Sequence, residues 1–226
     1  MRLLSKGSEN QYPPVYPFSL PTLRYNFSEL APLYSEESLR FHHQSIHGEY
    51  VKNLNSSLEE LLEFHDLSIE EILRNIHKVP EARREEVQFQ GGGHANHQFL
   101  WKILSPPAGQ EPQGELLKML NEAFGSVAVF KEKFEQAVLE LKFDGWVFLV
   151  LDPQHGRRLK IFSGTRNESV LYHGTPGLLI LDAWEHSFLG GPRISKSEYL
   201  TAYWTVVDWE RVGQRMEGIL SGKKQL

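Results

Sequence analysis

A proline- and glycine-rich stretch divides the chain into two unlike halves. Residues 105–114 are Ser-Pro-Pro-Ala-Gly-Gln-Glu-Pro-Gln-Gly, a composition typical of a linker. The sequence before it has helical periodicity, whereas the sequence after it changes from helical periodicity to short apolar runs typical of strands. The pattern predicts an α+β fold in which an N-terminal α-helical hairpin precedes a mixed domain with a small three-stranded antiparallel sheet and flanking helices.

The same division predicts the domain organisation. Residues 1–19 are proline-rich and are expected to form an irregular N-terminal arm. Residues 20–105 are expected to form the helical-hairpin domain, and residues 106–226 the C-terminal α+β domain.

Three helical segments are predicted in the first half, at about 35–64, 68–77 and 80–104, and the second is expected to begin with a capping box at Ser68–Glu71. The third contains Gly91, Gly92 and Gly93, and a glycine inside a helix costs about 1 kcal/mol relative to alanine. We therefore expect either that another part of the chain packs very close to the backbone there or that the helix is interrupted.

The second half is expected to begin with two helices and to end with one long amphipathic helix, with the strands between them. The predicted helices are 114–124, 126–140 and 196–220, and the predicted strands are 145–151, 159–163 and 178–182.

Charge and composition exclude several classes of function. The 226 residues carry a net charge of -5, which gives no general reason to expect nucleic acid or an anionic membrane as a partner. The absence of cysteine excludes disulfides, zinc fingers and thiolate-held clusters. No apolar run approaches the ~18 residues of a membrane span, and the N-terminus lacks the apolar core of a signal peptide. The expected location is the cytoplasm.

Common phosphate-binding and nucleophile motifs are absent. Gly109 and Gly114 have the spacing of a phosphate-binding loop, but Glu115 follows where such a loop needs lysine. No G-x-G-x-x-G, G-x-S-x-G or H-E-x-x-H occurs. The ten histidines are therefore the main chemical resource of the chain.

Potential metal ligands occur in both halves. The first predicted helix contains His42 with Tyr50 two turns later, the third contains His97, and the last predicted strand ends at Asp182, four residues before His186. Taken singly, such residues are more often core histidines or surface pairs than ligands. Together, three imidazoles and one carboxylate suit Mn, Fe or Zn.

The chain resembles the iron/manganese superoxide dismutase family over roughly residues 20–219. Three separated motifs carry the resemblance: Phe41–His47 with Tyr50 and Asn53, Gly91–His97 with Trp101, and Asp182–His186. The resemblance implies that His42, His97, Asp182 and His186 hold one Mn or Fe ion, with a solvent molecule as fifth ligand. It also implies an activity in which superoxide is converted to dioxygen and hydrogen peroxide as the ion alternates between trivalent and divalent states.

The resemblance further implies roles for residues around the metal. Tyr50 would line the entrance, and Trp146 would form part of the wall of the site. Glu185 would reach across the interface of a homodimer to the partner subunit's His186. Asn167 occupies the place of a glutamine that bonds the metal-bound solvent in manganese-type members, so the manganese-type arrangement is slightly favoured although the amide is one methylene shorter.

Two positions depart from the family where the two copies of a dimer would meet. Ile46 replaces a histidine, and Leu189 replaces the tyrosine that this histidine bonds in the partner. Loss of both members of a hydrogen bond is cheaper than loss of one, because no buried polar group is stranded. We expect an altered, apolar interface near these residues. Lys196 replaces an arginine near the substrate funnel and keeps its positive charge.

Two other functions compete with an active dismutase. A superoxide-dismutase-like scaffold with weak or no activity would explain the substitutions at Asn167 and Ile46. The four intact ligands argue against it, because burying polar groups without a use is costly. A non-haem iron oxygenase is a third reading, but that chemistry prefers two histidines and one carboxylate with more open positions.

Overall fold

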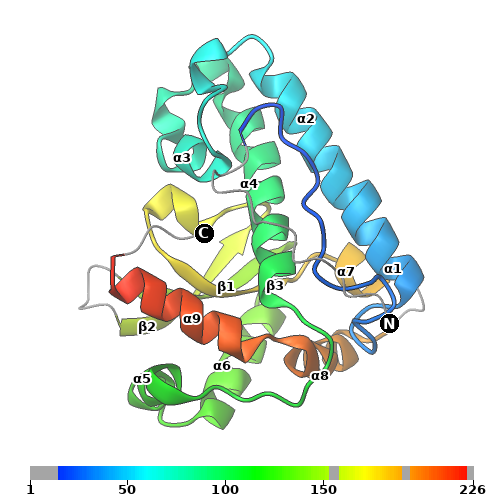
Figure 1. Ribbon diagram of the computed structural model, residues 1–226, viewed down its shortest axis with the longest axis vertical. Helices are drawn as coiled ribbons and strands as arrows, with labels where there is room; N and C mark the ends of the chain where they lie inside the picture. The colour runs from blue at the N-terminus through cyan, green and yellow to red at the C-terminus, as the bar shows by residue number, and fades with distance from the viewer. Residues whose placement is uncertain (1–14, 153–157, 190–193, 223–226) are drawn as a thin grey trace, which may run out of the picture.

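The computed structural model describes residues 15–152, 158–189 and 194–222 (Figure 1). Two long antiparallel helical segments form the hairpin, and a three-stranded sheet with its own helices follows them. This is the fold class predicted from the sequence. In the described residues no helix is long and apolar enough to cross a membrane.

The first long segment of the hairpin is helical from Glu36 to Leu58 and includes one π-helical stretch. It ends six residues earlier than predicted, and Leu62–Phe64 forms only a single 3₁₀ turn. Its parts are α1 (Glu36–Arg40), η1 (Phe41–His47, π-helical) and α2 (Gly48–Leu58).

The second long segment is α4 (Glu81–Ile103), which is continuous through its three glycines. It lies beside α2, and the short α3 (Ile69–Arg74) packs against it (Figure 1). Single 3₁₀ turns follow α2 as η2 (Leu62–Phe64) and precede α4 as η3 (Ile76–Lys78).

Serine caps fix where the helices begin. The Ser35 side chain accepts a hydrogen bond from the Ser38 amide at the start of α1. Ser68 and Glu71 form a reciprocal capping box at the start of α3, as the sequence predicted. Each cap satisfies amide groups that the first helical turn leaves without an intrahelical partner.

The second half places its sheet between helices. Strand β1 is central and pairs antiparallel with β2 on one side and β3 on the other. Helix α6 packs against β1 and β2, and α9 packs against α5 and β3. The elements are α5 (Gly114–Phe124), α6 (Val127–Leu139), β1 (Gly145–Asp152), β2 (Arg158–Thr165), η4 (Val170–His173), β3 (Gly177–Asp182), α7 (His186–Leu189), α8 (Lys196–Val206) and α9 (Trp209–Leu220).

The single C-terminal helix predicted over 196–220 is wrong, because the structure has two helices there. Val207 forms an isolated antiparallel bridge with Leu104, just beyond the end of α4. The Asp208 amide donates to the Ile103 carbonyl, and the Asp208 side chain caps α9. Backbone pairing with α4 therefore interrupts the helix where periodicity alone predicted continuity.

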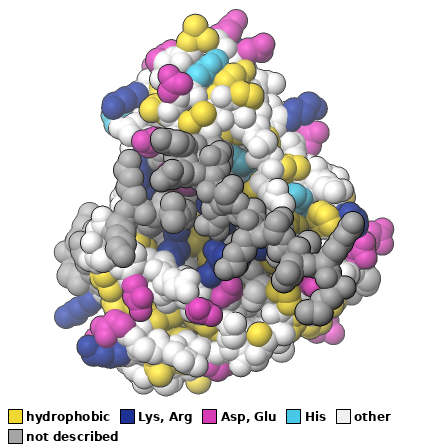
Figure 2. All heavy atoms as spheres, in the orientation of Figure 1, with side chains coloured by type: hydrophobic (Ala, Val, Ile, Leu, Met, Phe, Trp, Pro, Cys, Tyr) yellow, Lys and Arg dark blue, Asp and Glu magenta, His cyan; other side chains and the backbone are white. Residues whose placement is uncertain are grey.

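Two apolar clusters form the core. One lies within the hairpin between α2, α3 and α4, and the other surrounds the sheet and extends to the C-terminal end of α4. On the face shown in Figure 2, acidic and basic side chains are interspersed rather than separated by sign. The two halves meet where α4 packs against β3.

Candidate metal centre

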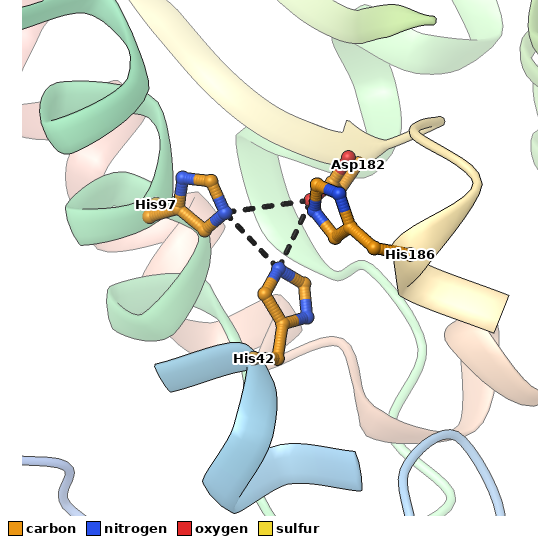
Figure 3. Close-up of side chains that lie close together, drawn as sticks. All are labelled: His42, His97, Asp182 and His186. Atoms are coloured by element: carbon orange, nitrogen blue, oxygen red, sulfur yellow. Dashed lines mark hydrogen bonds and ion pairs between the residues drawn. The ribbon is translucent and has the colours of Figure 1, made fainter. Parts of the chain in front are cut away.

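Four side chains from the two halves converge beside this contact (Figure 3). They are His42 from η1, His97 from α4, Asp182 from the end of β3 and His186 from the start of α7. One ligand atom from each lies within 4.8 Å of the others. We call these four residues the donor cluster.

The donor cluster is compact and buried. The Nε2 atoms of His42 and His97 are 3.0 Å apart, and Asp182 Oδ2 lies 3.1 Å from His42 Nε2. His186 Nε2 is 3.2 Å from the same oxygen. The side chain of His186 is 17% exposed, whereas the other three are at most 2% exposed, so the donor cluster faces solvent on the His186 side.

Local backbone contacts orient the carboxylate. Asp182 Oδ1 accepts a hydrogen bond from the Trp184 amide at 2.9 Å, which turns Oδ2 towards the imidazoles. Burial opposes ionisation of Asp182, but the neighbouring His186 and His42 outweigh it and hold the pKa of the carboxyl well below its usual range. The group is therefore a carboxylate.

A second backbone contact fixes the tautomer of His97. Its Nδ1–H donates to the Gly93 carbonyl at 2.7 Å, so Nε2 carries a lone pair directed into the donor cluster. Burial and the nearby His42 hold the pKa of His97 well below its usual value. Burial likewise lowers the pKa of His42, although its hydrogen bond to Asp182 opposes the shift. Both imidazoles are neutral at physiological pH.

The chemistry of this donor set fits a metal ion. Three imidazole nitrogens and one carboxylate oxygen are all electron-pair donors, and a cation is the group that satisfies them together. Such ligands suit Mn, Fe or Zn more than Mg or Ca, which prefer all-oxygen coordination.

Aromatic rings surround the donor cluster. Trp101 packs edge-on against His42 at 4.9 Å between ring centroids, and Trp146 packs edge-on against His97 at 4.8 Å. Trp146 comes from β1 and pairs with Asp182 of β3 across the sheet. Residues opposite one another on antiparallel strands present their side chains on the same face, so the strand register itself places Trp146 against the site.

Tyr50 completes the wall from α2. Its ring centroid lies 5.3 Å from that of His97. It fits there because Gly93 has no side chain: a Cβ on Gly93 would lie 2.5 Å from Tyr50 Cδ1. A Cβ on Gly92 would overlap the carbonyl oxygen of Asn167. Of the two explanations offered for the glycines, close packing is confirmed and interruption of the helix is not.

Asn167 links two of the expected site residues. Its Oδ1 accepts from Trp146 Nε1–H at 3.2 Å, and its Nδ2 donates to the Phe89 carbonyl at 3.2 Å. Burial raises the pKa of the Tyr50 phenol, and a hydrogen bond with the Asn167 side chain acts in the opposite direction. Arg166, just before Asn167, has φ 54°, a left-handed conformation that is uncommon for a residue other than glycine.

Of the remaining predicted residues, Glu185, Ile46 and Lys196 lie at or near the surface. The Glu185 side chain is exposed, and its amide donates to Asp144 Oδ1. Ile46 is half-buried. Leu189 ends α7, but its side chain lies outside the described part of the chain. Lys196 Nζ donates to the Val138 carbonyl at 3.1 Å, a contact that the sequence did not indicate.

The sequence did not single out His47, which lies directly against the donor cluster. Its ring stacks on His97 with centroids 5.2 Å apart. In an α-helix His42 and His47 would point about 140° apart. The π-helical geometry of η1, with its i to i+5 bonding, turns both towards His97. The five-residue spacing was visible, but nothing in the sequence revealed the wider turn.

A pair of buried tyrosines was also missed. The hydroxyl groups of Tyr34 and Tyr199 are 3.2 Å apart, and Tyr199 donates to the Asp182 carbonyl at 3.0 Å. Because Tyr199 uses its only proton there, Tyr34 is the donor between the two hydroxyls. Tyr34 also packs edge-on against His42. Its segment has no periodicity from which this position could be predicted.

A buried set of three imidazoles and one carboxylate, shared between a helical hairpin and an α+β unit, could hold a single metal ion. Comparison with known domain families agrees. The alpha-hairpin domain of iron/manganese superoxide dismutases matches residues 17–105, and the C-terminal domain of the same enzymes matches residues 112–215. The chain belongs to the iron/manganese superoxide dismutase family.

Curated relatives support this assignment over most of the chain. A protein named superoxide dismutase [Mn] from Thermus thermophilus is 35% identical over 195 residues, covering 86% of this chain and 95% of the relative. Superoxide dismutase [Mn] 1 from Leptolyngbya boryana is 35% identical, covering 88% and 80%. Superoxide dismutase [Mn] 2 from Bacillus anthracis is 33% identical, covering 92% and 98%.

Proposed function

We propose that this chain is a superoxide dismutase whose donor cluster holds one Mn or Fe ion. The reaction converts two superoxide anions and two protons into dioxygen and hydrogen peroxide. When bound, the ion supplies the redox chemistry by alternating between its trivalent and divalent states. The observation that carries the proposal is the convergence of four ligand atoms from both halves of the chain, in a member of this family.

The protein residues hold the ion and control access to it. Neutral imidazoles and one carboxylate can hold both oxidation states without a large rearrangement. Three tryptophans keep bulk water away from most of the donor cluster. Trp101 packs against His42, Trp146 packs against His97, and Trp184 stacks on His186 with ring centroids 5.7 Å apart. The more exposed His186 marks the side from which a small anion can approach.

Tyr50 is suited to meet that anion. Burial raises the pKa of its phenol, so the group keeps its proton at physiological pH and can donate a hydrogen bond. Asn167 bonds both Trp146 and Tyr50 through its side-chain amide, which places that amide beside the wall of the donor cluster. Direct contact of Asn167 with metal-bound solvent remains a prediction.

Manganese is favoured over iron by two observations. The relatives compared above are named as manganese enzymes. The amide beside Trp146 also comes from Asn167, after the β-hairpin, as in manganese-type members. In iron-type members the amide comes instead from the segment before the second ligand, where this chain has Gly93.

We further propose a homodimer. Glu185 is exposed and can accept a hydrogen bond from the partner subunit's His186. The Glu185 amide contacts Asp144, and the residue before Asp144, Phe143, is an apolar side chain that is 74% exposed. Sedimentation analysis would contradict this proposal by showing a monomer at micromolar concentration. The cytoplasmic location expected from the sequence remains a prediction, which cell fractionation tests.

Metal analysis and activity test the proposed function together. The purified chain should contain Mn or Fe at about one ion per chain and should dismutate superoxide rapidly. His97→Ala should lose the metal, because it removes one of the four ligands, the imidazole whose Nδ1–H is held by the Gly93 carbonyl. A matched control is His65→Ala, which removes a half-buried imidazole in the hairpin, away from the donor cluster.

Two results would contradict the proposal. Protein that takes up neither Mn nor Fe would exclude the metal site. Protein that retains one ion per chain but does not dismutate superoxide would instead favour the inactive metal-binding scaffold.

A further inference from the structure

The hairpin contains a second group of histidines that the proposed reaction does not use. His43, His47 and His94 are all at least 93% buried. His47 Nε2 lies 2.8 Å from His94 Nδ1, and Trp101 Nε1–H donates to His47 Nδ1 at 3.0 Å. Trp101, His47 and His94 thus form a continuous chain of hydrogen bonds beside the donor cluster, which we call the histidine chain.

The direction of the histidine chain is fixed at one end. An indole N–H can only donate, so Nδ1 of His47 must accept. A proton on that nitrogen would place two N–H groups against each other. The hydrogen of His47 is therefore on Nε2, from which it is donated to His94 Nδ1, and the hydrogen of His94 is on its own Nε2.

The far end of the histidine chain is closed. His94 Nε2 is buried and has no hydrogen-bond partner among the described residues. Phe18 packs against the His94 ring at 5.5 Å and is itself 3% exposed. Asn55 holds the backbone of Phe18 through two hydrogen bonds, of 2.8 and 2.9 Å. The segment before α1 therefore seals this end.

This geometry does not suit a proton relay. A relay must pass a proton in at one end and out at the other, but the indole N–H of Trp101 does not ionise in water and the opposite end is sealed by Phe18. The histidine chain instead contacts two members of the donor cluster. Trp101 packs against His42, and His47 stacks on His97.

We propose that the histidine chain positions the metal ligands: His94 orients His47, and His47 in turn holds both the His97 ring and the Trp101 wall. His47 and His94 are positioning residues, because neither has an atom in the donor cluster. This inference rests on the proposed metal site. Residues that orient metal ligands typically change metal affinity about 10- to 100-fold when they are removed, and an indirect contact belongs at the lower end of that range.

The test compares two substitutions at His94 in the full chain loaded with Mn(II). His94→Leu removes the acceptor for His47, whereas His94→Asn places an amide oxygen near the position of Nδ1 and preserves an acceptor. We expect His94→Leu to alter the Mn(II) electron paramagnetic resonance spectrum and to release Mn(II) to EDTA about 10-fold faster. His94→Asn should restore both properties towards those of the unsubstituted chain.

Two further variants separate positioning from general destabilisation. His65→Leu removes another half-buried histidine of the hairpin, whose Nε2 bonds the Leu58 carbonyl, and should leave the Mn(II) spectrum unchanged. Trp101→Phe keeps an aromatic ring but removes the donor at the other end of the histidine chain. It should alter the spectrum even if His94→Leu does not fold.

The outcomes distinguish this inference from the proposed function. An unsubstituted chain that binds neither Mn nor Fe would overturn both. An unsubstituted chain that binds Mn(II), with a His94→Leu variant of identical spectrum and release rate, would overturn positioning alone. The proposal would also be overturned if His94→Leu shifted the pH profile of turnover but left the Mn(II) spectrum unchanged, because a proton relay would give that result.

Discussion

Because Gly92 has no side chain, the segment after β2 can pack directly against α4. The Asn167 carbonyl and the Tyr172 hydroxyl occupy the space where a side chain of Gly92 would lie. The Tyr172 hydroxyl also donates to the Gln88 carbonyl of α4, which fastens the segment after β2 to the helix. A glycine, costly within a helix, therefore lets the Asn167 backbone pack directly against α4.

Gly92→Ala should therefore destabilise the protein. The new methyl group would meet backbone, which cannot rotate away, and overpacking of this kind typically costs about 1–3 kcal/mol. Gly213→Ala in α9 is the control, because nothing lies within 4 Å of its added Cβ. That substitution should stabilise by up to about 1 kcal/mol through helix propensity. Urea unfolding measures both, and equal effects would contradict the steric explanation.

At the scale of elements, the break between α8 and α9 depends on Asp208. Its side chain accepts from the Arg211 amide at 3.0 Å and lies 3.7 Å from Arg24. Arg24 also donates to the Lys102 carbonyl at the end of α4. One carboxylate therefore helps to join the segment before α1, the end of α4 and the start of α9.

Asp208→Ala should cost about 1–2 kcal/mol, because loss of an N-cap typically costs about 1 kcal/mol and the partly exposed ion pairs add little. Asp208→Asn keeps a capping oxygen and removes only the charge, so it should change stability by about 0.5 kcal/mol or less. Thermal or urea unfolding of the two variants checks this. Equal losses would show that charge, and not capping, holds the junction.

Periodicity and capping residues predicted most elements, because those signals are local. The capping box at Ser68 and the three strands were predicted in this way and are confirmed. The break at Val207 was not, because it results from pairing with Leu104 more than a hundred residues earlier. The π-helical turn at Phe41–His47 was also missed, since its sequence does not differ visibly from that of an α-helix.

The site was predicted less evenly than the fold. The donor cluster was found because ligand types are few and the motifs are specific. The surrounding hydrogen bonds were not, because they join residues whose proximity only the tertiary structure creates. His47 and His94 lie 47 residues apart, and Tyr34 and Tyr199 lie 165 apart.

Over the whole molecule, buried neutral histidines make stability depend on pH. Burial lowers the pKa of His94 to about 4 from an ordinary value of 6.5. Between these values the unfolded chain binds a proton at this residue that the folded chain does not. The contribution of neutral His94 to the free energy of unfolding is therefore greatest above pH 6.5. It decreases as the pH falls from 6.5 to 4 and does not decrease further below pH 4.

The lowered pKa of His94 predicts a loss of about 3 kcal/mol in the free energy of unfolding between pH 6.5 and 4, at about 1.4 kcal/mol per pKa unit. His94→Asn has no titrating group at this position. The slope of its free energy of unfolding against pH should therefore be smaller, by an amount that corresponds to at most one proton. Urea unfolding of metal-free protein at several pH values measures the two slopes. Identical slopes would show that His94 is protonated in the folded state.

The order in which the ribosome makes the chain adds a constraint on the donor cluster. His42 precedes its contact Asp182 by 140 residues, an interval of roughly 7 to 28 s at about 5–20 residues per second. The hairpin has its own apolar cluster and can begin to fold during that interval. Asp182 and His186 have not yet been made during that interval, so the donor cluster is complete only after His186 has been synthesised.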